Sequence, residues 1–558
     1  MVQSDPQGSK SRVLADHPAN SVDLNQHQTT RSEYSFVGLR SISTGFAVRE
    51  QCCTRAINLQ PNLSPAAPKT EPSMAHLPSF TRRAALAGGS LAVAAAAFPM
   101  TTQSQTSRPL SPKNAAAKEE YAYAIAIQAY LFAHPLFMTE RERKLRLTMT
   151  SPRPDEPAAP INQLGHLRKL ATASGSLPYS PNNDTLYTGA LLELKDQPMI
   201  LHVPDIPDRF FVVEVADAYT TNLPYFAGTR ASGGKGGDFA LVGPDWKGTL
   251  PTGVTEIRAP TNTLIVAIRN RVNDDTDVPE VNRLQDLYSI TALSDWSKGR
   301  GNTTPPVPKL LPRPDYTGDF SYFRTAADLM SENPPLPHDE AMVKSFEYIG
   351  LVPGKPFDAS QLDAPTLKGM MRAEKEGPEI VQWKILNRGV SSPTYWAVDL
   401  QGGSYGFDYL SRAEIAHSGL VANDPEEAVY FLTYFDGNGE RLDGSKKYVV
   451  HFAPGQLPTF DKLGFWSLTL YDGETYQFVK NPINRYSIGS RTNGLKFNQD
   501  GSLDIYAQSS TPAGHESNWL PSAEGRPVRL NIRCYLPTPE MLKMESAVKH
   551  LPPVKPQA

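Results

Sequence analysis

The sequence has little net charge, few cysteines and almost no long apolar run. Its 558 residues include 55 Lys and Arg against 58 Asp and Glu, which gives a formal net charge of −3. This balance argues against a protein whose main task is to neutralise the phosphates of a nucleic acid. One alanine-rich stretch near residue 90 comes closest to the roughly 20 apolar residues of a membrane-spanning helix. We therefore expect a soluble globular protein with no nucleic-acid partner and no stable membrane span.

Common cofactor motifs are also missing. Lys235 lies in a glycine-rich segment but is followed by Gly236 instead of Ser or Thr, so the phosphate-loop signature fails. The chain has no His-x-His, HExxH or paired CxxC motif, and so lacks the local spacing of a typical zinc site. We predict no cofactor and no metal, although metal ligands from distant strands remain possible.

The N-terminal region has the layout of an export signal. Residues 1–73 show no period of 2 or 3.6, and we interpret them as a disordered extension or a gene-model artefact, with Met74 as the true start. The adjacent Arg82 and Arg83 precede an uncharged, alanine-rich stretch, a pattern typical of a twin-arginine signal peptide over 74–100. The alternatives are an alanine-rich helix and a retained anchor. The signal predicts a periplasmic or secreted protein.

The rest of the chain alternates between helical and strand-like patterns. At 118–144, apolar residues at i, i+3, i+4 and i+7 predict a helix that is kinked or broken at Pro135. From about residue 186, short runs rich in Val, Ile, Leu and Phe predict an antiparallel sandwich. Helical patterns then return, and strands follow. We expect a mainly β fold with a helical insert, divided into 113–281 (first helix and β domain), 282–425 (helical insert), 426–547 (second β domain) and a tail at 548–558.

The cleanest alternation in the chain surrounds Cys534. This cysteine is the only one outside the N-terminal region, so it cannot form an internal disulfide there. It alternates with polar residues, which predicts a small apolar strand residue that faces a core instead of a catalytic thiol. The polar face of the same strand carries Arg529, Asn531 and Arg533.

One catalytic pattern matches formally. Gly402 to Gly406 reads GxSxG around Ser404, as in the nucleophile turn of a serine hydrolase. That turn should follow a buried strand and open a helix, and only the helix is expected here. We therefore interpret the segment as a glycine-permitted turn.

Two long stretches of sequence carry a family resemblance. They begin YSPNNDTLYTGALLEL at residue 179 and FWSLTLYDGETYQ at residue 465, and each continues through a fixed order of polar and aromatic residues. They resemble the paired domains catalogued as domain of unknown function 1254 and domain of unknown function 1214, over about 117–542. The resemblance implies an immunoglobulin-like β domain, a helical region and a C-terminal jelly-roll-like β domain, usually in exported bacterial proteins. It implies no catalytic residue set.

Polar clusters in both β domains supply candidate site residues. The cluster around Asp184 precedes a strand and is either a structural Asx turn or a site with Asp184 as acid, base or ligand anchor. The cluster around Arg485 suits a carboxylate, sulfate or sugar, or else an ion pair between domains. Trp519 is either a stacking platform or a core residue. The candidate catalytic residues are Asp184 and Arg485, and the candidate ligand-binding residues are Asn182, Asn183, Tyr187, Asn484, Tyr486, Arg491 and Trp519.

Two functions remain open at this point. The first is an exported enzyme, a hydrolase or lyase, that acts on a small organic or carbohydrate-like molecule in a cleft between the β domains. The second is a non-catalytic ligand-binding or envelope-associated protein. An enzyme should place Asp184, or another titratable group in a perturbed environment, facing Arg485 in one pocket. A binder should show a shallow aromatic groove instead.

Overall fold

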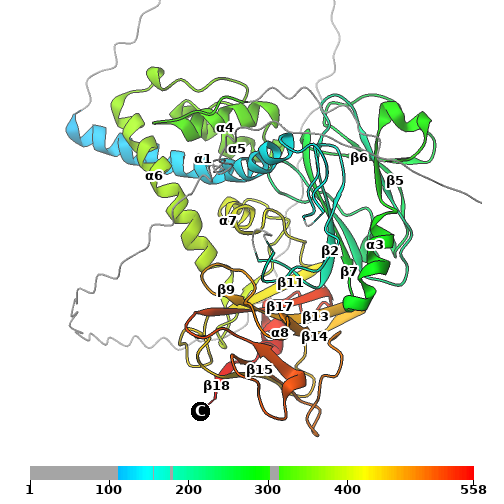
Figure 1. Cartoon of the computed structure of the whole chain (residues 1–558). Helices are drawn as coiled ribbons and strands as arrows, with labels where there is room; N and C mark the ends of the chain where they lie inside the picture. The colour runs from blue at the N-terminus through cyan, green and yellow to red at the C-terminus, as the bar shows by residue number, and fades with distance from the viewer. Residues whose placement is uncertain (1–110, 155, 176–179, 302–312, 558) are drawn as a thin grey trace, which may run out of the picture. The chain divides into compact units, whose positions relative to one another are not determined.

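The computed structural model describes residues 111–154, 156–175, 180–301 and 313–557. The expected extension at 1–73 and the expected signal peptide at 74–100 lie outside the described residues. The described residues form three groups of elements, a helical region and two β units (Figure 1).

The helical region is built around one long N-terminal helix. Helix α1 (Pro112–Leu147) begins after Ser111, whose hydroxyl accepts a hydrogen bond from the Asn114 N–H. It continues through Pro135 without a break. Apolar residues on both sides of Pro135 pack into one core with the later helices, and this packing offsets the hydrogen bond that proline removes. These helices are α4 (Ser321–Glu332), α5 (Glu340–Ser345), α6 (Ala364–Leu386) and α7 (Tyr409–Gly419).

Helix α1 therefore packs with the helical region and not, as the expected division had it, mainly with the first β domain. Its closest neighbour is α6. Gly369 and Gly377 of α6 make this approach possible: a β-carbon at Gly369 would lie 2.5 Å from the Glu119 carbonyl oxygen, and one at Gly377 would lie 2.6 Å from the Tyr130 ring. Larger side chains at these two positions would separate the helices.

The first β unit consists of two four-stranded sheets over a shared apolar core. All neighbouring strands are antiparallel except β5 and β6. The unit extends past the expected boundary at residue 281, because β8 pairs with β3. One sheet has the order β1 (Gly165–His166), β2 (Thr185–Glu193), β7 (Thr263–Arg271) and β4 (Phe211–Ala216). The other has the order β6 (Val254–Arg258), β5 (Gly237–Val242), β3 (Met199–Val203) and β8 (Ser289–Ala292), and the short helices are α2 (Thr229–Ser232) and α3 (Val278–Gln285).

The second β unit also packs two sheets over one core. It recruits strands from the expected helical insert and from the expected tail. The six-stranded sheet has the order β14 (Ser487–Gly489), β13 (Phe460–Asp472), β17 (Val528–Pro537), β11 (Ala428–Thr433), β10 (Ala397–Asp399) and β9 (Val390–Ser391). The four-stranded sheet has the order β16 (Trp519–Pro521), β15 (Leu503–Gln508), β12 (Tyr448–Phe452) and β18 (Val554–Pro556), and α8 covers Met544–Ala547.

Strand β17 lies at the centre of this unit, between β13 and β11. Its even-numbered residues from Val528 to Cys534 belong to the core, and Cys534 is fully buried. The prediction that Cys534 faces a core is confirmed. Because side chains alternate along a strand, the odd-numbered residues point to the opposite face of the sheet.

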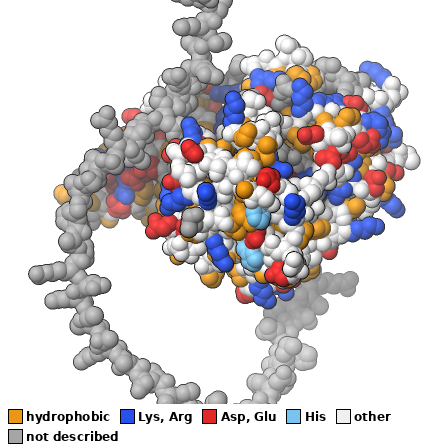
Figure 2. Space-filling view, turned by 60° about the horizontal axis from the view of Figure 1, so that its bottom comes forward, with side chains coloured by type: hydrophobic (Ala, Val, Ile, Leu, Met, Phe, Trp, Pro, Cys, Tyr) orange, Lys and Arg blue, Asp and Glu red, His pale blue; other side chains and the backbone are white. Residues whose placement is uncertain are grey.

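The four sheets and the intervening helices confirm a mainly β fold with a helical insert. The immunoglobulin-like and jelly-roll-like topologies stay predictions. Across the described residues, no helix combines the length and apolar character needed to cross a bilayer. The space-filling view in Figure 2 shows one face of the molecule, on which charged side chains of both signs are interspersed.

Candidate functional site

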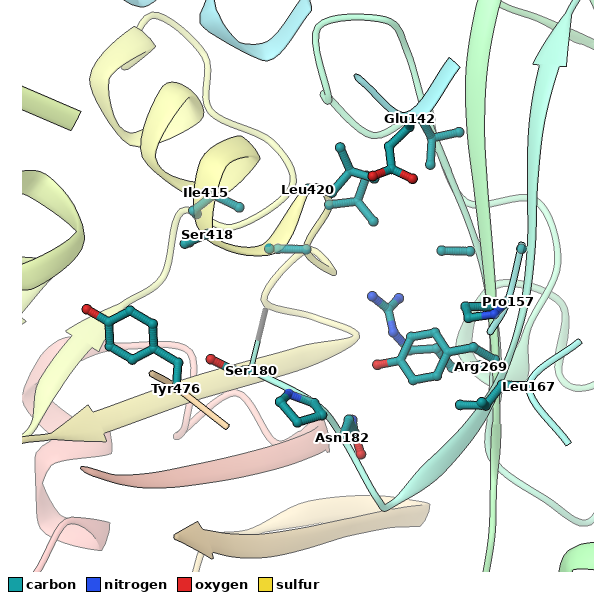
Figure 3. A pocket seen from close by; sticks show the side chains of 18 of the residues that line it. Glu142, Pro157, Leu167, Ser180, Asn182, Arg269, Ile415, Ser418, Leu420 and Tyr476 are labelled. Atoms are coloured by element: carbon teal, nitrogen blue, oxygen red, sulfur yellow. The ribbon is translucent and has the colours of Figure 1, made fainter. Parts of the chain in front are cut away.

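A cavity of about 340 Å³ lies where the helical region meets the two β units (Figure 3). In Figure 3, Arg269 and Leu167 lie on the side of the first β unit, whereas Ile415 and Leu420 lie opposite, at α7. Glu142 at the end of α1 points into the cavity from a third direction. The cavity is thus formed by segments that are far apart in the sequence.

The polar face of β17 supplies one wall of this cavity. Arg529, Asn531 and Arg533 alternate along the strand and all three line the cavity. They are only 6%, 6% and 4% exposed. The sheet therefore holds two buried guanidinium groups, with an amide between them, against an otherwise largely apolar space.

Neither of these arginines has a carboxylate partner. Arg529 donates a hydrogen bond to the Ser180 hydroxyl at 2.5 Å. Arg533 donates to the hydroxyls of Thr469 at 2.9 Å and Tyr471 at 2.5 Å. Within the described stretches of the chain, no carboxylate oxygen lies within 4 Å of either guanidinium. Each group has five N–H donors, so donors remain available for a ligand.

Aromatic rings hold the two guanidinium groups in place. The Tyr471 ring is close to both, with its centre 4.9 Å from the Arg529 Cζ and 5.6 Å from the Arg533 Cζ. The Tyr476 ring, which also lines the cavity, lies 4.9 Å from the Arg529 Cζ. Such cation–π contacts stabilise a guanidinium but supply no negative charge. The two positive charges therefore remain uncompensated by the residues in direct contact with them.

A third cavity arginine, Arg269, is compensated. It forms an ion pair with the buried Glu214 and donates to the Asn423 Oδ1 at 3.0 Å. Asn423 in turn donates to the Tyr430 hydroxyl at 3.2 Å. This network links Arg269 of β7 to Tyr430 of β11 through the Asn423 side chain.

Tyr187 lies beside Arg269 on the neighbouring strand. The two residues are direct partners in the β2–β7 register, and the Arg269 Cζ lies 5.1 Å from the centre of the Tyr187 ring. Burial raises the pKa of Tyr187, but the positive charges of Arg269 and Arg533 outweigh this effect and lower the pKa below its usual value. Tyr430 differs, because burial raises its pKa.

The other charged groups at the cavity wall are paired. Arg146 and Glu142 form an ion pair at 2.6 Å, and Arg388 pairs with the buried Glu414. The positive character of the cavity therefore comes mainly from Arg529 and Arg533.

The polar clusters around Asp184 and Arg485 do contact each other, but the contact is made by Arg491 and not by Arg485. Asp184 is fully buried; its Oδ1 accepts a hydrogen bond from Arg491 at 2.5 Å, and its Oδ2 accepts one from Ser467 at 2.6 Å. Arg491 also donates to the Val272 carbonyl. Asp184 and Arg491 thus form an ion pair between the β units, and neither lines the cavity.

Of the two residues before Asp184, Asn182 lines the cavity and Asn183 makes a structural contact. The Asn182 Oδ1 accepts from the Asp184 N–H at 2.6 Å, which is the geometry of an Asx turn. Asn182 also lines the cavity and donates to the Tyr535 hydroxyl at 2.6 Å. Asn183 accepts from Ser487 across the two β units at 3.1 Å. Asn182 and Tyr187 are the predicted residues that reach the cavity.

Arg485 does not face Asp184, in contrast to the arrangement expected of an enzyme. It donates to the carbonyls of Glu516, Ser517 and Trp519 at 3.1, 3.1 and 2.9 Å, and so braces a loop of the second β unit. Trp519 is 3% exposed, so it is a buried core residue and not a stacking platform. Asn484 and Tyr486 hydrogen-bond to each other at 3.3 Å, and neither lines the cavity.

The GxSxG segment forms a turn. Gly403 and Gly406 have φ values of 79° and 55°, in the left-handed region that glycine adopts readily. The Ser404 hydroxyl donates to the Asp424 carboxylate at 2.9 Å. This arrangement agrees with the structural interpretation of the segment.

Sequence reasoning missed Arg269, Arg529, Asn531 and Arg533 as site residues. The alternation of β17 gave a usable signal for three of them, since a polar face with two arginines on a central strand must be buried against something. Arg269 gave no such signal. Among the described residues, no group of three or more His, Cys, Asp or Glu side chains is arranged to hold a metal ion.

Comparison with protein families assigns both β units. Residues 161–292 match the family described as "Protein of unknown function (DUF1254)", and residues 427–539 match "Protein of unknown function (DUF1214)". The chain carries a DUF1254 domain followed by a DUF1214 domain. Tyr187 and Arg269 belong to the DUF1254 domain, whereas Arg529 and Arg533 belong to the DUF1214 domain. The cavity therefore requires both.

One solved structure shares this fold. The crystal structure of the VPA0106 protein from Vibrio parahaemolyticus is similar with a TM-score of 0.58 and 23% identity, over 78% of this chain and all of that chain. An uncharacterised protein from Burkholderia cenocepacia gives a TM-score of 0.35 and 12% identity, over 81% of this chain and 90% of that chain. No curated protein matches the sequence. The similarity to the Vibrio protein concerns the fold alone.

Proposed function

We propose that this protein binds a small organic acid in the cavity between its DUF1254 and DUF1214 domains. The carboxylate contacts Arg529 and Arg533, and the apolar body of the ligand packs against Leu167, Ile415 and Leu420. The observation that carries the proposal is the pair of buried guanidinium groups on the cavity wall, without a carboxylate partner among the described residues.

The physical reason is the high free energy of a buried charge that has no anion in contact with it, since Asp184, which also acts on Arg533, is paired with Arg491. Taking a guanidinium out of water costs several kcal/mol unless an anion is paired with it. Arg529 and Arg533 keep only neutral hydroxyl and aromatic neighbours within contact distance. A ligand carboxylate supplies the missing charge and accepts paired N–H donors, a geometry that suits guanidinium.

The size and surface of the cavity favour a small ligand that is only partly polar. A volume of about 340 Å³ is at the lower end of ligand sites. The β17 wall is polar, whereas the wall at α7 carries Ile415 and Leu420. A carboxylate attached to a ring or short chain matches both walls, as does a carbohydrate-like acid.

The two functions considered above, an enzyme and a binding protein, differ in whether the bound acid is a substrate. A hydrolase or lyase needs a proton-transfer group beside the ligand, and a binding protein does not. We also propose export through the twin-arginine signal at Arg82 and Arg83, on the basis of the sequence.

The experiment that tests the proposal compares phenylacetate with phenylacetamide, which has a similar shape and no charge. Isothermal titration with the parent protein should detect phenylacetate and not the amide. Arg533→Gln, which removes the charge but retains a polar side chain, should weaken phenylacetate binding by ten-fold or more. Arg283→Gln serves as the control, because Arg283 is exposed on α3 and pairs with Glu280. Equal binding of acid and amide, or unchanged binding in Arg533→Gln, would refute the proposal.

A further inference from the structure

The charged side chains on the cavity wall do not balance one another. Most of them belong to ion pairs, which are Arg146–Glu142, Arg153–Glu156, Arg269–Glu214 and Arg388–Glu414. The exceptions among the described residues are Arg529 and Arg533, whose hydrogen-bond partners are neutral. Asp184 also acts on Arg533, but it is itself paired with Arg491. The wall therefore carries an excess of two positive charges.

A ligand with one carboxylate compensates only half of this excess. A carboxylate carries one negative charge, whereas each guanidinium is permanently charged. A buried charge that has no anion in contact with it raises the free energy of the folded protein. After a monoacid has bound, one of the two guanidinium groups is still in this state. The charge of the wall therefore favours a ligand with two negative charges.

The two guanidinium groups also occupy separate places on the wall. Arg529 and Arg533 are four residues apart on β17, so their backbones are roughly 13 Å apart. They share no hydrogen-bond partner among the residues that the structure describes. Arg529 donates to Ser180, whereas Arg533 donates to Thr469 and Tyr471. Each group thus offers its remaining donors at its own position.

These positions lie toward different sides of the cavity. In Figure 3, Tyr476, whose ring contacts Arg529, lies on one side, and Arg269 lies on the other. Arg533 is the direct partner of Tyr430 in the β11–β17 register, and a single side chain links Tyr430 to Arg269. Arg529 is therefore next to Tyr476, and Arg533 lies toward Arg269.

One small molecule can still reach both groups. The Tyr471 ring centre lies 4.9 Å from the Arg529 Cζ and 5.6 Å from the Arg533 Cζ, so the side chains converge although their backbones do not. The cavity volume of about 340 Å³ limits the ligand to a short chain. Two carboxylates joined by a few carbons match both the spacing and the charge.

We infer that the cavity binds a short-chain dicarboxylic acid, with one carboxylate at Arg529 and the other at Arg533. The inference rests on the proposed function, because it names the ligand class of the same carboxylate site. The wall at Ile415 and Leu420 accommodates an apolar group on the chain. A single doubly charged centre, such as a phosphate, supplies the same charge but places all of it at one position.

The first measurement compares three ligands on the parent protein by isothermal titration, at about pH 7.5, where carboxylates are ionised. Phenylsuccinate has two carboxylates, 3-phenylpropionate lacks one of them, and phenyl phosphate has one centre that is almost doubly charged. Phenylsuccinate should bind at least ten-fold more tightly than either of the others. Its second carboxylate accepts charged hydrogen bonds from a guanidinium that otherwise has only neutral partners.

The second measurement repeats the comparison in Arg529→Gln. This variant should bind phenylsuccinate and 3-phenylpropionate with affinities within about three-fold of each other, because one guanidinium remains and a second carboxylate gains little without an arginine. Folding should survive, since the substitution removes a buried charge that has no anion partner. Arg283→Gln, on the exposed face of α3, should keep the parental ratio of affinities.

The outcomes separate this inference from the proposed function. If the parent binds none of the acids, phenylacetate included, the carboxylate site itself fails, and the inference fails with it. If the monoacids bind but phenylsuccinate binds no more tightly than 3-phenylpropionate, the carboxylate site stands and the dicarboxylate inference is wrong. Tightest binding of phenyl phosphate, or a parental ratio of affinities in Arg529→Gln, would overturn the inference in the same way.

Discussion

The ion pair between Asp184 and Arg491 should be a major source of stability at the junction of the two β units. The carboxylate of Asp184 is about 1% exposed and accepts hydrogen bonds from Arg491 and Ser467. Replacing it in Asp184→Asn keeps the shape but removes the charge, so Arg491 loses its anion. The buried Arg533, on which Asp184 also acts electrostatically, loses a stabilising charge as well.

The expected loss of unfolding free energy in Asp184→Asn follows from the burial of the ion pair. Breaking a fully buried ion pair costs roughly 3 to 5 kcal/mol. The Arg491 side chain is 19% exposed and keeps its hydrogen bond to the Val272 carbonyl. We therefore expect the lower end, about 3 kcal/mol of unfolding free energy.

Equilibrium unfolding in urea, followed by tryptophan fluorescence and circular dichroism, measures this change. Asp286→Asn is the control, because Asp286 is 62% exposed in its pair with Arg168. Its loss should cost at most about 1 kcal/mol. If Asp184→Asn costs no more than this control, the junction does not depend on the pair, and the argument from burial is refuted.

Four further predictions concern other sites. Arg485→Lys keeps the charge but reaches fewer of the three carbonyls, so it should cost about 1 kcal/mol of stability in urea unfolding while phenylacetate binding stays parental; lost binding would return Arg485 to the site. Burial raises the pKa of Glu193 from 4.5 to about 7, so the parent should lose roughly 3 kcal/mol of stability as pH rises from 4.5 through 7, and Glu193→Gln should not. If the stability of both proteins changes equally with pH over this range, the raised pKa of Glu193 is contradicted. Ser404→Ala should leave any hydrolytic activity within a few-fold in a kinetic assay, whereas a loss of about 10³ would restore the interpretation of Ser404 as a hydrolase nucleophile. Replacing Arg82 and Arg83 with lysine should leave precursor in the cytoplasm when fractions are immunoblotted, and unchanged export would exclude the twin-arginine route.

Local sequence patterns predicted much of the fold. The alternation around Cys534 predicted both the strand and its core-facing side, because a period of 2 follows directly from strand geometry. The helix at 118–144 was foreseen, but its continuation through Pro135 was not. That continuation depends on packing against later helices, which a local pattern does not contain.

The site was less accessible because its parts are distant in the sequence. Asp184 and Arg491 were both singled out, but no local pattern shows that Arg491 and not Arg485 reaches Asp184 across 307 positions. Tyr187 was named, whereas its partner Arg269 was not, since their proximity arises from the β2–β7 register. Two residues of β17, Arg529 and Arg533, were visible as a polar face, but only the second sheet and the helices show that this face borders a cavity.

The proposed site uses Arg529 and Arg533 to hold the carboxylate of a small organic acid. The most direct measurement is a crystal structure with 4-bromophenylacetate, in which anomalous scattering locates the bromine. We expect a carboxylate in contact with Arg529 or Arg533 and bromine toward Ile415 and Leu420. A ligand bound elsewhere, or one whose carboxylate points away from both arginines, would contradict it.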